Sequence, residues 1–220
     1  MSLLPAIEYE TQPNPDASVI WLHGLGADGN DFAPIVPELR LPESLAIRFI
    51  FPHAPSIPVT VNGGFVMPAW YDILEMDIDR KVDTTQLMKS AAEINGFVTR
   101  ELNQNIQSKR IIIAGFSQGG AVAYQVALSH ELPLAGLLAM STYFATVDSI
   151  NLSDSNKQIP IKIQHGTHDP VVPESLGQKA TTQLIKLGYS VNYQNYPMEH
   201  AVCPQQISDI SLWLQEILRK

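Results

Sequence analysis

The chain has 220 residues, of which 45% are hydrophobic and 16% are charged, and its formal net charge is −8. This length is typical of one α/β domain, and the apolar content is enough to bury a sizeable core. The acidic balance lacks the basic surface that nucleic-acid binding needs, and it does not draw the protein to anionic membranes. We therefore expect a single domain over residues 1–220 and no nucleic-acid partner.

The cysteine content and the N-terminal sequence bear on the cellular location of the protein. Cys203 is the only cysteine, which excludes an intramolecular disulfide and fits a reducing environment. The first residues lack a basic stretch followed by a long apolar one, and no run approaches the ~20 apolar residues of a membrane span. We expect a cytoplasmic protein without stable membrane insertion.

Short apolar runs that end in turn residues alternate with helical patterns along the chain. Because these runs are apolar on both faces, they suit interior parallel strands covered by helices on each side. The alternation predicts an α/β fold with a doubly wound, mostly parallel sheet. The expected strands are 18–22, 47–51, 110–115, 136–140, 161–164 and 191–196, and the expected helices are 83–103, 119–130, 175–187 and 204–219.

Residues 54–79 interrupt this alternation. The interval is rich in proline, contains two adjacent glycines and carries exposed-looking apolar residues such as Phe65, Met67 and Trp70. A long irregular segment in a compact domain is usually functional or disordered, and this apolar content argues against disorder. We predict an irregular loop packed beside the functional site. The same apolar surface could serve as a lid or as a homodimer contact.

Gly115-Phe116-Ser117-Gln118-Gly119 is the most informative motif, and it lies between an apolar β-branched run and a helical pattern. A serine between a strand end and a helix start sits in a sharp turn, where flanking glycines remove the steric clashes. The free N–H groups at the helix start can stabilise an anion. The pattern is typical of the nucleophile elbow of a serine hydrolase and predicts Ser117 as the nucleophile.

A nucleophilic serine needs a general base, which in turn needs a carboxylate to hold its tautomer. In α/β-hydrolases the chain order is serine, acid, histidine, and His200 is the histidine that follows both other members. We predict His200 as the base. We expect His53 and His165 to be buried hydrogen-bonding residues and His130 to be a solvated residue at a helix end.

Asp169 is the predicted acid, because it follows a strand that turns at a glycine and so lies at the carboxyl edge of the sheet. Its alternative role is an Asx turn before Pro170. Asp148 and Asp154 lie in a polar stretch that resembles a surface loop. The remaining acidic candidates between the serine and the histidine are Glu131, Glu174 and Glu199.

A glycine-rich turn, residues 23–29, follows the first apolar strand. It lacks the Gly-Lys-Ser/Thr ending of a phosphate-binding P-loop. Beside a nucleophile elbow it is suited to present one N–H group to a developing oxyanion, and the second donor is the residue after the nucleophile. We assign these roles to the backbone N–H groups of Leu25 and Gln118.

Together these segments resemble the carboxylesterase and acyl-protein thioesterase (lysophospholipase-like) family of small α/β-hydrolases. The matching stretches are 19–26, 51–55, 69–72, 115–120 and 165–173, in order over nearly the whole chain. The resemblance implies a hydrolase without a large helical cap, a Ser117–His200–Asp169 triad, and Leu25 and Gln118 as oxyanion donors. It also implies that Trp70 and the 54–79 loop, with Phe65 and Met67, shape an apolar substrate-binding groove.

Family members cleave carboxylic esters, and several cleave thioesters of fatty-acylated proteins or lysophospholipids. The predicted mechanism is acyl transfer through an acyl-enzyme, with no metal or organic cofactor. One departure is Glu199, where the family commonly has a small residue; a nearby carboxylate would raise the pKa of His200. The alternatives are a serine peptidase, which usually carries an extra cap or propeller domain, and a catalytically silent binding module.

Overall fold

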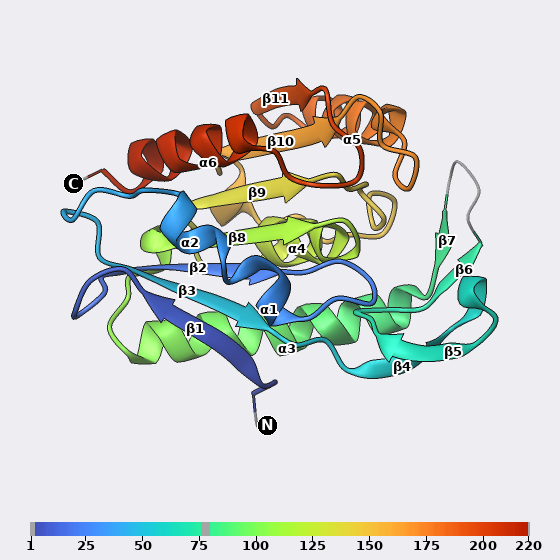
Figure 1. Ribbon diagram of the computed structural model, residues 1–220, viewed down its shortest axis with the longest axis horizontal. Helices are drawn as coiled ribbons and strands as arrows, with labels where there is room; N and C mark the ends of the chain where they lie inside the picture. Colours follow the sequence, from blue (N-terminus) through green and yellow to red (C-terminus); the bar gives the residue numbers. More distant parts are fainter. Residues whose placement is uncertain (1–2, 76–79, 220) are drawn as a thin grey trace.

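The computed structural model describes residues 3–75 and 80–219, and these residues form a seven-stranded central sheet in the order β1-β3-β2-β8-β9-β10-β11 (Figure 1). β1 pairs antiparallel with β3, and all other neighbours in the sheet are parallel. The mostly parallel sheet of the prediction is thereby confirmed. Its strands are β1 (Ala6–Glu10), β2 (Ala17–Leu22), β3 (Ile47–Pro52), β8 (Ile111–Phe116), β9 (Gly136–Met140), β10 (Ile161–Gly166) and β11 (Val191–Tyr196).

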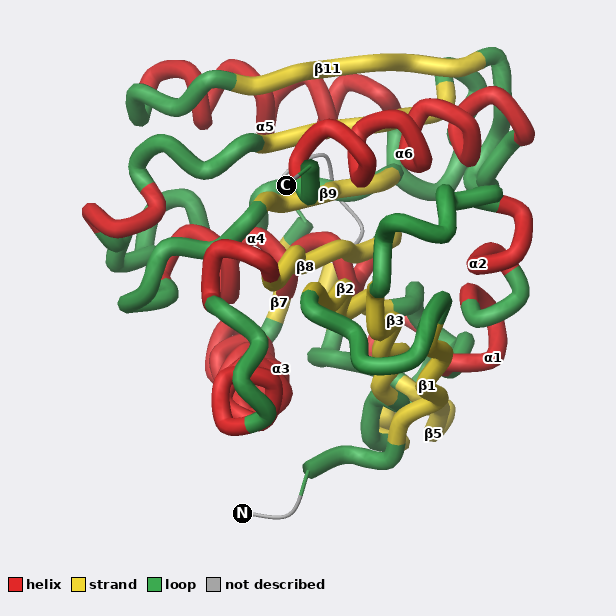
Figure 2. Tube along the Cα trace, turned by 90° about the vertical axis from the view of Figure 1, so that its left-hand side faces the viewer, coloured by secondary structure: helices red, strands yellow, loops and turns green. Residues whose placement is uncertain are grey.

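Helices cover both faces of this sheet. The long ones are α3 (Thr84–Asn103), α4 (Gln118–Ser129), α5 (Glu174–Lys186) and α6 (Pro204–Ile217), and the short ones are α1 (Gly29–Phe32) and α2 (Ile35–Glu38). In Figure 2, α3, α4 and α5 lie on one side of the strands, and α1, α2 and α6 lie on the other. Short 3-10 turns occur at Thr60–Asn62, Ser108–Arg110 and Asp154–Asn156.

Alternate residues of the interior strands belong to two separate apolar clusters. In β8, Ile111 and Ile113 pack under α3 and α4, whereas Ile112 and Ala114 pack under α6 and the short helices. Because successive side chains of a strand point to opposite faces, a sheet covered on both faces needs apolar residues at every position. This explains the unbroken apolar runs in the sequence.

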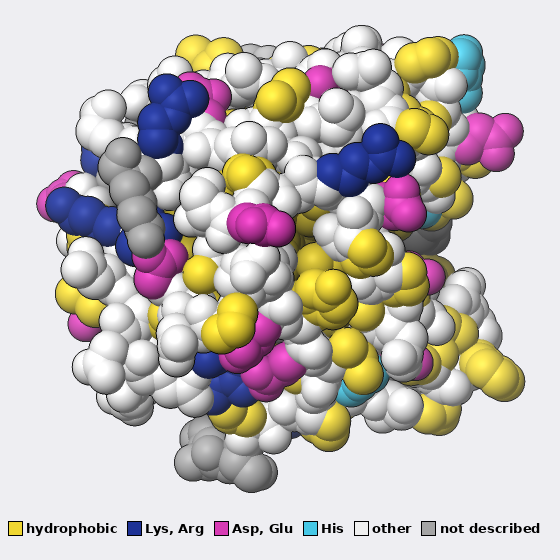
Figure 3. Space-filling view, turned by 60° about the vertical axis from the view of Figure 1, so that its left-hand side comes forward, with side chains coloured by type: hydrophobic (Ala, Val, Ile, Leu, Met, Phe, Trp, Pro, Cys, Tyr) yellow, Lys and Arg dark blue, Asp and Glu magenta, His cyan; other side chains and the backbone are white. Residues whose placement is uncertain are grey.

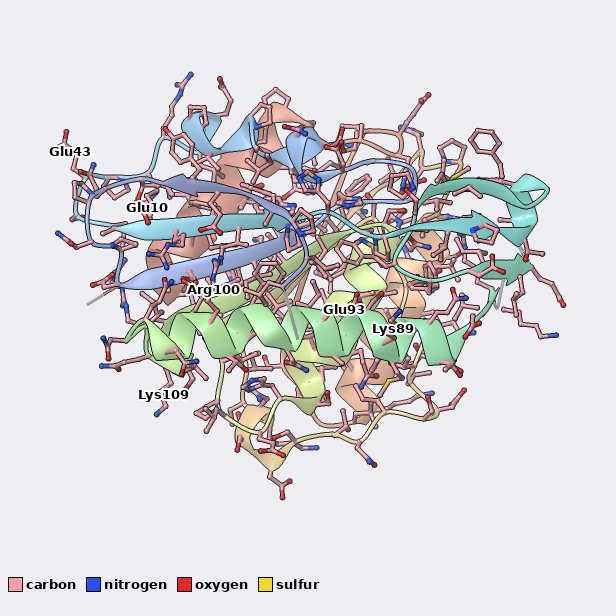
Figure 4. The ribbon with its side chains drawn as sticks, turned by 90° about the horizontal axis from the view of Figure 1, so that it is seen from below. Glu10, Glu43, Lys89, Glu93, Arg100 and Lys109 are labelled. Atoms are coloured by element: carbon pink, nitrogen blue, oxygen red, sulfur yellow. The ribbon has the colours of Figure 1, made fainter. Side chains whose placement is uncertain are left out.

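A buried ion-pair network joins the antiparallel edge of the sheet to α3. The Glu101 carboxylate is fully buried and pairs with Arg48 of β3 and with Arg100 of its own helix. Arg48 also pairs with Glu10 of β1, and Arg100 pairs with Glu8 (Figure 4, where Glu10 and Arg100 are labelled). The network ties β1 to β3 and to α3.

The expectation of an irregular loop over residues 54–79 is wrong where this interval forms strands. β4 (Ser56–Val59) pairs antiparallel with β5 (Phe65–Pro68), and β6 (Ile73–Glu75) pairs antiparallel with β7 (Lys81–Val82). Gly63 and Gly64 have φ of 67° and 78° and lie in the connection between β4 and β5, where the chain must adopt left-handed conformations. Positions 76–79 lie outside the described residues.

Both hairpins lie at the carboxyl end of the parallel strands, as Figure 1 shows. They are small additions to the sheet, and the described residues contain no large cap domain. In the described parts of the chain no helix combines the length and apolar character that crossing a bilayer requires. On the face in Figure 3, basic side chains are scattered among acidic ones.

Candidate active site

Ser117 lies in the sharp turn between β8 and α4, with φ of 54° and ψ of −121°. A positive φ is rare for residues other than glycine. A Cβ at Gly115 would lie 2.4 Å from the carbonyl oxygen of Gly119, and one at Gly119 would lie 2.5 Å from a carbonyl oxygen just after β2. The Ser117 N–H donates to Met140 O at 2.9 Å, which helps to hold the turn. The structure therefore has the tight turn that the two glycines predict.

Ser117, His200 and Asp169 form a hydrogen-bonded chain at the carboxyl edge of the sheet. His200 Nε2 lies 2.9 Å from Ser117 Oγ, and His200 Nδ1 lies 2.7 Å from Asp169 Oδ2. A carboxylate can only accept, so Nδ1 carries the proton and Nε2 is left to accept from the serine hydroxyl. The three residues follow β8, β10 and β11, which brings them together from distant parts of the sequence.

The Asp169 carboxylate serves two purposes at once. Oδ2 faces His200, whereas Oδ1 accepts from the N–H groups of Val171 and Val172 at 2.9 and 2.8 Å. Burial opposes ionisation, but the hydrogen bonds from His200 and from these backbone groups outweigh it and lower the pKa of Asp169. The two roles weighed from the sequence, a partner for histidine and an Asx turn, therefore occur together.

The other histidines have structural partners. His165 is fully buried, and its Nε2 lies 2.8 Å from Val172 O, while His53 accepts from the Gly29 N–H at 3.1 Å. Burial lowers the pKa of His165. His130 caps the end of α4, and its Nδ1 accepts from a nearby backbone N–H. His165 is the buried hydrogen-bonding residue that was expected, whereas His53 makes a hydrogen bond but is only partly buried.

Two competing acids, Asp148 and Asp154, are exposed, as a surface loop predicts. Glu199 is exposed as well, and in the described residues its side chain makes no hydrogen bond or ion pair. No hydrogen bond or ion pair joins Glu199 to His200 in the described residues. Within the described chain, no group of three or more His, Cys, Asp or Glu side chains is arranged to hold a metal ion.

The turn after β2 lies directly against the serine. A Cβ at Gly24 would be 3.4 Å from Ser117 Cβ, so position 24 lies within van der Waals reach of the serine. His23 holds the turn: its Nδ1–H donates to Gly24 O at 2.7 Å, and its Nε2 accepts from the Ala54 N–H at 3.1 Å. Burial lowers the pKa of His23 and keeps this neutral tautomer.

Gln118, one predicted oxyanion donor, directly follows Ser117, and Leu25, the other, lies in the turn after β2. Leu25 follows Gly24 in the turn, and the next N–H, that of Gly26, is already bonded to Pro68 O at 2.8 Å. Gln118 is the first residue of α4, where backbone N–H groups have no partner within the helix. Their role as donors stays a prediction that this placement allows.

The predicted substrate-binding side chains occupy different environments. Phe65 is 69% exposed on the β4–β5 hairpin, and Met67 is half-buried, with its sulfur 3.8 Å from where a Cβ would stand at Gly26. Trp70 is only 1% exposed, so it does not line an open groove as expected. Its indole N–H donates to His23 O at 2.9 Å, beneath the turn.

A pocket of about 420 Å³ lies beside the loop that carries Asp169, and sequence reasoning missed it. Its wall includes Tyr143 and Phe144, which follow β9, and Leu176 in the first turn of α5. Arg80 borders it, with its guanidinium over the Tyr143 ring and bonded to Val171 O. No sequence motif marks the residues after β9. Ser117 and His200 are not among the lining residues.

The model of the phospholipase/carboxylesterase family matches residues 4–218, nearly the whole chain. The chain belongs to the phospholipase/carboxylesterase family. This family member is therefore a hydrolase that cleaves esters, and its α/β-hydrolase fold agrees with the resemblance seen in the sequence.

Relatives of this family member cover it almost completely. Acyl-protein thioesterase 1 of Neurospora crassa is 37% identical over 99% of this chain and 91% of its own length, and that of Cryptococcus neoformans is 35% identical over 92% and 93%. Among solved structures, Zea mays acyl-protein thioesterase 2 has a TM-score of 0.85 and 27% identity over 98% and 99% of the two chains. Arabidopsis thaliana SOBER1 has a TM-score of 0.86 and 26% identity over 92% and 99%.

Proposed function

We propose that this esterase hydrolyses esters and thioesters of apolar acyl groups through an acyl-enzyme on Ser117. The observation that carries the proposal is the position of His200, whose two ring nitrogens bond the serine hydroxyl and the Asp169 carboxylate at 2.9 and 2.7 Å. This arrangement activates a hydroxyl that is a poor nucleophile by itself.

In the first step, Ser117 Oγ attacks the carbonyl carbon and His200 Nε2 takes its proton. Asp169 stabilises the imidazolium that forms, and the Leu25 and Gln118 N–H groups bind the oxyanion. Each such donor lowers the barrier by roughly 2.7–4 kcal/mol. His200 then protonates the departing alcohol or thiol. Water attacks the acyl-enzyme by the same route and restores the serine.

Substrate chemistry is proposed from the β4–β5 hairpin and from the relatives. Met67 lies against Gly26 of the turn beside Ser117, and Phe65 of the same hairpin is exposed, so the hairpin offers apolar surface for a hydrocarbon chain. The curated relatives are called acyl-protein thioesterases, which supports an acylated protein as substrate. A catalytically silent binding module would have no need for the strained turn at Ser117 and its bonded histidine.

Labelling with a fluorophosphonate tests the nucleophile. We expect the native protein to be labelled, Ser117→Ala to be unlabelled, and Cys203→Ser to be labelled like the native protein. Absence of label on the native protein, or label that survives Ser117→Ala, rejects the proposal.

A series of p-nitrophenyl esters from acetate to laurate, alongside an acyl-thioester and a lysophospholipid, tests the substrate class. We expect kcat/KM to rise with chain length, and we expect turnover of the thioester. Because each buried methylene contributes about 0.8 kcal/mol, or roughly fourfold, kcat/KM should rise with each added methylene until the chain is longer than the site. A preference for acetate over every longer chain contradicts an apolar acyl site.

The location and assembly of the protein are further proposals. The single cysteine supports a reducing compartment, and we propose the cytoplasm. Phe65 and Val66 are 69% and 58% exposed on the β4–β5 hairpin, and we propose this surface for any homodimer. Sedimentation of the native protein and of Phe65→Ser tests the dimer: a native monomer, or a dimer unchanged by the substitution, contradicts it.

A further inference from the structure

Trp70 bonds to both segments that carry the proposed oxyanion donors, although it belongs to neither. Its backbone N–H donates to Gln118 Oε1 at 2.8 Å, and its indole N–H donates to His23 O at 2.9 Å. Gln118 carries one donor N–H, and His23 begins the turn that carries the other, on Leu25. One buried residue therefore spans the two halves of the oxyanion site.

The Gln118 side chain is fixed at both ends of its amide. Oε1 accepts from the Trp70 N–H, while Nε2 donates to the Tyr71 carbonyl oxygen at 2.6 Å. The side chain is 2% exposed, so water cannot substitute for these partners. This pairing ties the first residue of α4 to the backbone between β5 and β6.

The indole ring of Trp70 contacts the turn after β2, which carries the other donor. The rings of Trp70 and His23 pack with centroids 5.0 Å apart, and the indole N–H satisfies the buried His23 carbonyl. The Trp70 carbonyl accepts from Ser90 Oγ of α3. Each polar atom of Trp70 thus has a partner, and the residue is anchored to a long helix that belongs to the core.

We propose that Trp70 is a positioning residue that sets the spacing of the two oxyanion donors, which replaces its expected role as an acyl contact. The inference rests on the proposed function, since it concerns the oxyanion site of the same reaction. Because the donors bind the oxyanion only in the transition state, a displaced donor lowers kcat and leaves ground-state binding nearly unchanged.

Trp70→Phe is the test, because phenylalanine keeps most of the ring and removes the indole N–H. Loss of a whole oxyanion donor lowers kcat by about 10²- to 10³-fold, and a misplaced group costs up to about 10²-fold. We expect kcat to fall roughly 10- to 100-fold by the same factor for acetate and for laurate esters. KM should change less than about twofold, because the oxyanion donors contribute little to binding of the ground-state substrate.

Trp21→Phe is the matched control. Trp21 is also buried, at 1% exposure, and in the described residues its indole nitrogen has no hydrogen-bond partner. This variant loses a buried N–H that bonds nothing, so kcat should be unchanged. Gln118→Met tests the other half, because it keeps the length of the side chain and removes both amide bonds; its kcat should fall as in Trp70→Phe.

The affinity of a trifluoromethyl ketone gives a readout that mere loss of packing would not move. This probe adds to the serine and places an oxyanion in the site, so we expect its affinity to weaken by the same factor as kcat/KM in Trp70→Phe and Gln118→Met. A KM effect that grows with chain length would assign Trp70 to the acyl groove. An equal loss in Trp21→Phe would assign the effect to packing. Either result overturns the inference.

The native protein separates this inference from the proposed function. If native turnover is abolished by Ser117→Ala but Trp70→Phe and Gln118→Met both retain native kcat, only the positioning role is rejected. If either variant does not fold, as judged by circular dichroism, the other decides the outcome. A native protein without turnover or label rejects the proposed function itself.

Discussion

His165 Nε2 lies 2.8 Å from the carbonyl oxygen of Val172, and the backbone N–H of Val172 donates to Asp169 Oδ1, also at 2.8 Å. Since a carbonyl can only accept, Nε2 carries the imidazole proton. Both the N–H and the carbonyl group of Val172 are therefore hydrogen-bonded. A buried histidine outside the proposed triad thus restrains the loop from which Asp169 reaches His200.

Replacement of His165 by Phe should therefore impair the acid loop without removing a reacting group. The Val172 carbonyl would lose its buried partner, at a cost of about 1–3 kcal/mol in the free energy of unfolding. We expect kcat to fall roughly tenfold with KM nearly unchanged, because a shifted Asp169 supports the imidazolium less well. Urea unfolding and ester kinetics measure both. His168→Phe is the control, since His168 is exposed; an equal effect there would contradict the prediction.

Gly177→Ala should destabilise the protein although it lies within α5. Alanine in a helix is usually favoured over glycine by roughly 0.5–1 kcal/mol. A Cβ at this position, however, would stand 2.4 Å from His165 Nδ1 in a buried setting. We expect a net loss of about 1–3 kcal/mol in the free energy of unfolding. Gly96→Ala in α3 meets only the end of the Leu3 side chain, at 3.0 Å, and should be neutral or stabilising. Thermal unfolding of both variants distinguishes these outcomes.

As the pH falls, the free energy of unfolding should decrease before Asp169 is protonated. Burial lowers the pKa of His23 and of His165, whereas in the unfolded chain both titrate near ~6.5. As the pH falls below about 6.5, the unfolded chain takes up protons that the folded protein does not, so the free energy of unfolding decreases. Each histidine contributes up to about 1.4 kcal/mol per pH unit until its folded pKa is reached.

Urea unfolding at pH 8, 7, 6 and 5 measures this dependence. The stability should be flat between pH 8 and 7 and should fall from pH 6 to 5. His165→Phe should show a shallower decrease, because only His23 then remains of the pair. The lowered pKa of Asp169 contributes stability that is lost only at still lower pH, below about 4. A rise in stability from pH 7 to 5 would contradict the assignment.

Glu101→Ala should be among the most destabilising single substitutions. Its carboxylate is fully buried and pairs with Arg48 and Arg100. Its removal leaves Arg48 and Arg100 with only the partly exposed Glu10 and Glu8, and it takes the acceptor from the buried Ser18 hydroxyl, so we expect a loss of up to about 3–5 kcal/mol. Lys89→Ala on the exposed face of the same helix should change the free energy of unfolding by less than about 0.5 kcal/mol. Comparable losses in the two variants would show that the network contributes little.

Local pattern was sufficient to predict the elbow and six of the seven strands of the central sheet. Gly115 and Gly119 are needed because of contacts within a few residues, and the six apolar runs each became a strand at nearly the expected bounds. Chain order alone selected His200, whose bonding to Ser117 and Asp169 the structure now shows.

Features that depend on distant partners were not predictable in the same way. β1 carries exposed Glu8 and Glu10, and its pairing with β3 depends on Arg48 and α3, far along the chain. The sequence shows that position 70 carries an apolar ring, but it does not show that the indole N–H bonds the carbonyl of His23. For that reason the residue was expected at the surface of a groove, whereas it lies in the interior.

The arm formed by residues 54–75 has a consequence for engineering. It bonds through Trp70 to the turn after β2 and to the start of α4, and through Pro68 to Gly26. The arm is therefore not an independent module. A chimera that imports this arm from a relative should keep the native kcat only when the imported segment supplies an indole at position 70 and the recipient keeps glutamine at 118. Recombination between family members should tolerate crossovers elsewhere more readily than crossovers that separate these two positions.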